Sequence, residues 1–65
     1  MLTEYICPKE YYPGQILWYE INKLIGFTIV GVIDVKETKV EICVISTQTV
    51  FWVDKTDLRE KHIYD

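Results

Sequence analysis

The chain contains no alanine, a single serine, a single histidine and two cysteines, and these shortages limit both its fold and its chemistry. Helices favour alanine at surface positions, whereas isoleucine, valine and threonine, which favour strands, supply a third of this chain. A single histidine also excludes a cluster of histidine ligands around a metal ion. The composition therefore predicts an all-β protein without a histidine-rich metal site.

Cys7 and Cys43 are too few for the disulfide framework of a small secreted domain. A zinc site built from both cysteines and His62 would have only three protein ligands, without paired C-x-x-C spacing. We therefore predict free thiols, no metal and no cofactor. The lack of alanine beside plentiful isoleucine and lysine is typical of an AT-rich gene, so we expect the cytoplasm of a bacterial host.

Nucleophilic catalysis also lacks support in the sequence. Ser46, the only serine, falls in a predicted turn, and nothing nearby in the sequence positions it against His62 and an acid. The carboxylate pair Asp54 and Asp57 also falls at a predicted turn, where acidic residues cap the backbone and aid solubility. We therefore expect that the protein is not an enzyme.

Long hydrophobic runs and basic runs are both missing. The longest apolar run, 24–33, is far shorter than the ~20 residues needed to cross a bilayer, so we expect no membrane contact. The early acid Glu4 is unlike the basic start of a signal peptide. The net charge is −3 with both signs interspersed, so the basic stripe typical of nucleic-acid binding is absent.

The sequence does contain apolar residues at every second position through three successive segments. Because side chains on a strand alternate between two faces, we predict strands over 26–35, 40–46 and 49–53. Short connections between them imply an antiparallel meander. The predicted inward residues are Phe27, Ile29, Ile33 and Val35, then Val40, Ile42 and Val44, then Phe51 and Val53.

The flanking segments carry turn and strand signals. Pro13 and Gly14 predict a turn before a strand over 15–21, with Leu17, Tyr19 and Ile21 facing inward. A helical turn over 20–25 is the alternative to a strand end there.

The two ends of the chain and the glycine within the meander carry further predictions. Residues 1–10 form an N-terminal arm that is either irregular or a short strand. After the meander, Leu58 is expected to plug the core before a last strand over 59–64. Within the meander, Gly31 marks either a bend or a position where a side chain would clash, and both readings predict harm from a bulky residue.

The run Pro13-Gly14-Gln15-x-Leu17-x-Tyr19, the meander and the run Asp54-x-x-Asp57-Leu58 together resemble an SH3-like small β-barrel. The resemblance implies a five-stranded antiparallel barrel with a short 3₁₀ turn before the last strand, formed by one domain over 1–65. The likeness is nearest to small bacterial and phage SH3-like proteins, whose roles are diverse, so it predicts a fold rather than a function.

The face of the meander opposite the predicted core is also rich in apolar residues. A sheet with one solvated face normally alternates with polar residues, and so large an exposed patch is uncommon on a monomer. The N-terminal arm, a second copy or a different protein could cover it. We place Trp52 at its centre, because tryptophan and tyrosine dominate binding hot spots. The candidate protein-binding residues are Trp52, Val50, Ile45, Val30, Val32, Trp18 and Tyr12.

The sequence is therefore interpreted as a protein-binding module, from a phage or mobile element, that modulates or inhibits a host or defence protein. A homodimeric structural component of a virion or complex is the first alternative. Single-stranded nucleic-acid binding by aromatic stacking is the second, although that mode favours a basic groove.

Overall fold

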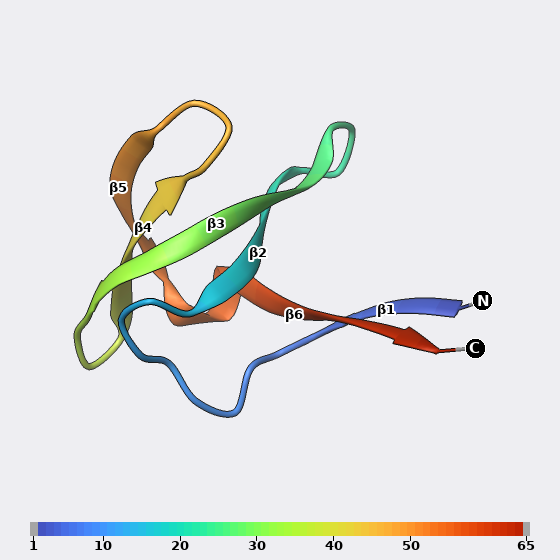
Figure 1. The fold of residues 1–65 in the computed structure, drawn as a ribbon, viewed down its shortest axis with the longest axis horizontal. Helices are drawn as coiled ribbons and strands as arrows, with labels where there is room; N and C mark the ends of the chain where they lie inside the picture. The colour runs from blue at the N-terminus through green and yellow to red at the C-terminus, as the bar shows by residue number, and fades with distance from the viewer. Residues whose placement is uncertain (1, 65) are drawn as a thin grey trace.

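Six antiparallel strands and one 3₁₀ turn build the fold in the computed structural model, which describes residues 2–64 (Figure 1). The strands join in the order β1-β6-β2-β3-β4-β5. The elements are β1 (Leu2–Ile6), β2 (Ile16–Asn22), β3 (Gly26–Val35), β4 (Lys39–Val44), β5 (Thr49–Asp54), η1 (Lys55–Asp57) and β6 (Leu58–Tyr64).

The all-β class and the 3₁₀ turn before the last strand are confirmed. The prediction of five strands in a barrel is wrong on two points. Residues 2–6 form an additional strand, and the sheet is not closed, because β1 and β5 lie at its opposite edges.

The meander β3-β4-β5 forms as predicted, with tight connections between its strands. The alternative of a helical turn over 20–25 is wrong, because Asn22 organises a reversal there instead. Its side-chain Oδ1 accepts the amides of Leu24 and Ile25 at 2.9 and 2.7 Å. Gly26 then begins β3 with a positive φ of 89°, which glycine adopts without strain.

One cluster of buried apolar side chains forms the core, on one side of the curled sheet. Tyr11, Tyr19, Val35 and Phe51 pack against it partly buried. The predicted inward residues of β4, together with Val53 and the plug Leu58, are all buried in it, so these predictions are confirmed. The buried residues are Leu17, Val30, Val32, Val40, Ile42, Val44, Val53 and Leu58.

A β-bulge at Ile33 determines which side chains of β3 enter this core. Val32 pairs with Ile42, but Asp34 already pairs with Glu41, so β3 has one extra residue. A bulge shifts the alternation of side chains by one position. Val30 and Val32 are therefore 0% and 4% exposed, whereas Ile33 is exposed.

The inward prediction for β3 is consequently correct only at Val35, beyond the bulge. Phe27 and Ile29 are half-buried on the opposite face, where Ile29 pairs with Trp18. The prediction that Val30 and Val32 face outward is wrong, because both belong to the core.

The N-terminal arm contains a strand at residues 2–6, so of the two alternatives for the arm the short strand is correct there and the irregular segment is not. β1 pairs with β6 from Leu2↔Tyr64 to Ile6↔Glu60, and the two strands project from the body as a ribbon (Figure 1). The Tyr5 ring stacks on Phe27, with ring centroids 4.0 Å apart, and meets Trp18 edge-on at 6.0 Å. Tyr5 thus anchors the ribbon beside β2 and β3.

Candidate functional site

The sheet surface that points away from the core carries a row of apolar positions across four strands. Ile16 on β2 pairs with Gly31 on β3, Gly31 pairs with Cys43 on β4, and Cys43 pairs with Val50 on β5. Directly paired residues place their side chains on the same face of a sheet. We call this surface the outer face; its members are Ile16, Trp18, Glu20, Phe27, Ile29, Gly31, Asp34, Glu41, Cys43, Ile45, Val50 and Trp52.

The middle of the outer face is apolar and open. Ile16 is 55% exposed and Val50 is 49% exposed, while Cys43 between them is half-buried. Gly31 contributes no side chain, and a Cβ built there would meet no heavy atom within 4 Å. The row therefore offers flanking aliphatic side chains around a bare stretch of backbone.

Charged residues border the outer face near the β3–β4 turn. Trp52 pairs with Glu41, and the Lys36 amine lies 6.0 Å from the centroid of its ring. The neighbouring ion pair between Lys39 and Asp54 is short, at 2.6 Å, but exposed to solvent, so it adds little stability. The apolar middle and this charged border together resemble the core and rim of a protein interface.

The structure brings three of the predicted binding residues together. Trp52 and Val50 lie on β5, 43% and 49% exposed. Ile45 directly follows β4 and donates its amide to the carbonyl of Ile29. Val30 and Val32 lie on the other side of the sheet, buried in the core, so they cannot contact a partner in this fold.

The two remaining predicted residues lie apart from this group. Trp18 is on the outer face but half-buried, with the Lys61 amine 4.5 Å from its ring centroid and Tyr5 at its edge. Tyr12 is in the loop before β2, where the Gln15 side chain accepts its amide at 3.2 Å. Its ring is exposed, and its backbone is hydrogen-bonded to Gln15, which is not an outer-face residue.

Several outer-face residues are missing from the predicted binding residues, among them Ile16, Ile29 and Gly31. Ile16 could have been found from the sequence, because it precedes the inward-facing Leu17 and adjacent side chains on a strand point to opposite faces. Ile29 and Gly31 were assigned to the inward set of positions, because the bulge at Ile33 leaves no mark in the apolar pattern of β3.

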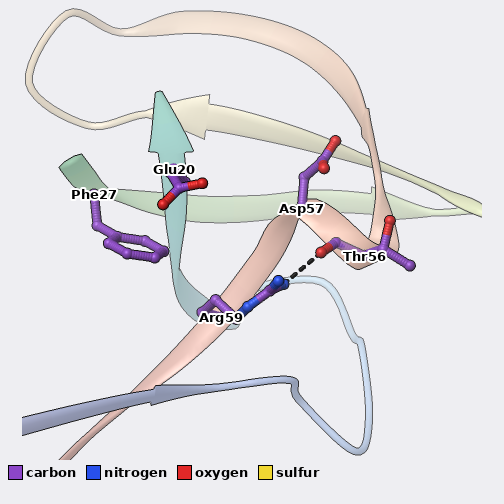
Figure 2. Close-up of a pocket in the computed structure, with 5 residues that line it drawn as sticks. All are labelled: Glu20, Phe27, Thr56, Asp57 and Arg59. Carbon is purple, nitrogen blue, oxygen red and sulfur yellow. Dashed lines mark hydrogen bonds between the residues drawn. The ribbon is translucent and has the colours of Figure 1, made fainter. Parts of the chain in front are cut away.

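A small polar pocket of about 180 Å³ lies where β6 leaves β2 (Figure 2). The Arg59 side chain reaches toward η1 and donates hydrogen bonds to the carbonyls of Thr56 and Leu58. Glu20 and Asp57 contribute carboxylates to the lining, and Phe27 supplies its apolar side. Arg59 therefore stabilises the 3₁₀ turn. Within residues 2–64, no three histidine, cysteine, aspartate or glutamate residues lie close enough together to bind a metal ion.

A larger apolar cleft of about 360 Å³ opens on the core side, between the β2–β3 and β4–β5 hairpins, which diverge at their tips in Figure 1. Tyr19 and Phe51 line it with an edge-to-face contact, their centroids 5.7 Å apart. Ile21, predicted to face inward, points into this cleft and is 45% exposed, because the unclosed sheet leaves it uncovered. The full lining is Tyr19, Ile21, Thr28, Val44, Ser46, Thr47, Thr49 and Phe51.

Tyr11 links the loop before β2 to η1. Its hydroxyl donates to the Lys55 carbonyl at 3.0 Å, and the Lys55 amine lies 5.3 Å from its ring centroid. Burial raises the pKa of the Tyr11 phenol above its ordinary value, and the neighbouring Cys7 raises it further. This contact is structural, since it joins two connecting segments around the core.

The chain matches no known family model, no curated protein and no solved structure. Across residues 2–64 there is no helix with the length and hydropathy needed to span a membrane.

Proposed function

We propose that this protein is a non-enzymatic binding module that contacts a partner protein through its outer face. The observation that carries the proposal is an apolar row on the face of the sheet opposite the core. The row consists of Ile16, Gly31, Cys43 and Val50. Exposed apolar patches bordered by polar residues are typical of protein-interaction sites. Trp52 serves as the anchor, since tryptophan side chains supply a large share of interface energy.

The open backbone at Gly31 suits a partner side chain that reaches the sheet between Ile16 and Val50. The flanking residues are each about half exposed, so they lose further apolar surface when the partner seats. Burial of apolar surface contributes roughly 25 cal/mol per Å². The face therefore favours an apolar or aromatic protrusion on the partner over a flat, charged surface.

The strand meander and the 3₁₀ turn before the last strand support an SH3-like relationship for the fold. In the same proposal, the partner is a host or defence protein in the cytoplasm of a bacterium, and this chain is a phage or mobile-element product that modulates it. The AT-rich composition and the small size support that setting.

Capture from a lysate of the host bacterium tests the proposal with four tagged chains. Wild type and Leu24→Lys should retain the same partner, because Leu24 is 97% exposed at the β2–β3 turn, outside the outer face. Ile16→Lys and Trp52→Ala should lose it, the latter by about 2 kcal/mol or more in binding free energy, as for a hot-spot residue. Equal retention by all four, or loss caused only by Leu24→Lys, would contradict the proposal.

A further inference from the structure

The outer edge of β5 presents unpaired backbone groups. Lys55 donates its amide to Thr38, and Ile45 donates its amide to Ile29. Hydrogen-bonded and non-hydrogen-bonded pairs alternate along an antiparallel ladder, so Phe51 and Val53 direct their backbone groups to β4. Val50 and Trp52 consequently direct theirs away from it. Within residues 2–64 no other strand pairs with that edge.

This edge carries none of the features that commonly block strand addition. Natural edges are protected by proline, by bulges or by charged side chains, lysine above all. Residues 49–53 include no such residue, and the pairing of β4 with β5 is regular. The opposite edge of the sheet, β1, has Glu4 in its middle. Only β5 therefore combines an apolar sequence with a continuous run of free backbone groups.

We infer that the free edge of β5 pairs antiparallel with β5 of a second copy of this chain, with Val50 opposite Trp52. In this register each Val50–Trp52 pair exchanges two backbone hydrogen bonds across the molecular two-fold axis. An aromatic residue opposite a β-branched one is a favourable cross-strand pair. The unpaired groups of both residues are thereby satisfied.

Charge disfavours the registers shifted toward Asp54, and only the Val50–Trp52 register pairs the aromatic residue with the β-branched one in both copies. A register with Trp52 opposite Trp52 would place the Asp54 carboxylate opposite Val50, and a further shift would place it opposite Trp52. In the Val50–Trp52 register Asp54 stays beyond the paired segment with its partner Lys39. The two Asp54 carboxylates then lie at opposite ends of the new ladder, so no like charges face each other.

The inference rests on a different observation from the proposed function, namely the free backbone groups at the edge of β5, although the side chains of Val50 and Trp52 also belong to the outer face. A two-fold axis perpendicular to the sheet keeps both outer faces on the same side. The dimer would therefore present two adjacent outer faces to a partner, which raises avidity for a partner with two matching sites.

Amide hydrogen exchange of the purified protein, measured by NMR at several concentrations, tests the pairing together with sedimentation. We expect the Val50 and Trp52 amides to exchange more slowly as dimer forms. The Phe51 and Val53 amides, bonded to β4, should be protected at every concentration. A monomer at millimolar concentration, or a dimer in which Val50 and Trp52 stay unprotected, would overturn the inference.

Two variants separate edge pairing from contact through the outer face. Val50→Pro removes an amide that points to the free edge rather than to β4, so it should weaken dimerisation by about tenfold or more. Ile45→Lys alters the outer face away from the edge and should leave the dissociation constant unchanged. Loss of the dimer in Ile45→Lys, with Val50→Pro still dimeric, would overturn the inference while leaving the outer face as an interaction surface.

Discussion

Gly26 and Gly31 both belong to β3, but the backbone makes different demands on them. Gly26 has a φ of 89°, in the region where an L side chain is strained. Gly31 lies in ordinary extended backbone, with open space where its Cβ would be. A Cβ at Gly31 would therefore meet no steric clash. The absence of a side chain at this position shapes the outer face instead of relieving crowding.

Gly31→Ala and Gly26→Ala should consequently change stability in opposite directions. Gly31→Ala should raise the free energy of unfolding by about 0.4–1 kcal/mol, because alanine has less conformational freedom in the unfolded chain. Gly26→Ala should lower it by about 1–2 kcal/mol, the cost of a left-handed conformation. Urea denaturation of the pair measures both changes. Destabilisation by Gly31→Ala would contradict the prediction that a methyl group fits at this position.

The raised pKa of Tyr11 predicts that the protein loses stability in alkaline solution. Its pKa is raised in the fold by burial, so above pH ~10 the unfolded phenol loses its proton before the folded one does. The unfolded state then binds fewer protons, and the free energy of unfolding falls as pH rises. The contribution of Tyr11 is thus complete below that pH and is lost as pH rises through the raised pKa.

Tyr11→Phe isolates this contribution from the other tyrosines and the lysines. At pH 7 the variant should be less stable by about 0.5–1.5 kcal/mol, since the hydrogen bond to Lys55 is lost. The difference from wild type should narrow above pH ~10 in urea titrations. A difference that stays constant with pH would mean that the Tyr11 hydroxyl titrates equally in both states.

At the scale of strands, the inward-facing set of β4 could be predicted from its sequence, whereas that of β3 could not. On β4 the alternation of Val40, Glu41 and Ile42 separates a buried set from one with a polar member. On β3 both sets are apolar, so hydropathy gives no way to choose between them. The choice depends on the bulge at Ile33, which arises from pairing with β4, a long-range contact.

The candidate site could be predicted from the sequence only in part, and the errors again fall on β3. Ile45 was assigned to the correct face because the polar Glu41 marks the outward set of β4. Val50 and Trp52 were also assigned correctly, although residues 50–53 of β5 are all apolar. Val30 and Val32 were assigned to the wrong face with the rest of β3. The sixth strand was left open, because β1 is paired only with a segment almost sixty positions away, and no local signal reports that pairing.

The β1–β6 ribbon should depend on Tyr5 for its position. A two-stranded ribbon alone is only marginally stable in water. Tyr5→Ala removes the ring contacts to Phe27 and Trp18 and should cost about 1–2 kcal/mol. We expect faster amide exchange along β1 and a change in tryptophan fluorescence. Thr3→Ala, on the same side of β1 but farther out, should leave both signals unchanged; equal effects of the two variants would contradict the anchoring role.

For the whole molecule, the stability margin is narrow and the surface is large. The accessible surface is 4675 Å². A compact monomer of this mass exposes roughly 4,300 Å², so the ribbon and the diverging hairpins leave more surface in water than usual. A core of this size supplies about 3–5 kcal/mol of net stability. Each fully buried side chain is therefore a large fraction of what keeps the chain folded.

Ile42→Ala should unfold most of the protein at 25 °C. Ile42 is fully buried on β4, paired with Val32 on one side and Phe51 on the other, so its truncation leaves a cavity at the centre of the meander. Such a substitution costs about 2–5 kcal/mol, which is comparable to the entire margin. Circular dichroism and the dispersion of amide signals in NMR measure the loss.

Ile45→Ala is the matched control, because it removes the same atoms from an exposed position three residues farther along the chain. It should change the free energy of unfolding by no more than about 0.5 kcal/mol. If Ile42→Ala kept a cooperative thermal transition close to that of wild type, the buried cluster could not be the main source of stability. Stability would then have to come from association, and the transition temperature of wild type would rise with protein concentration.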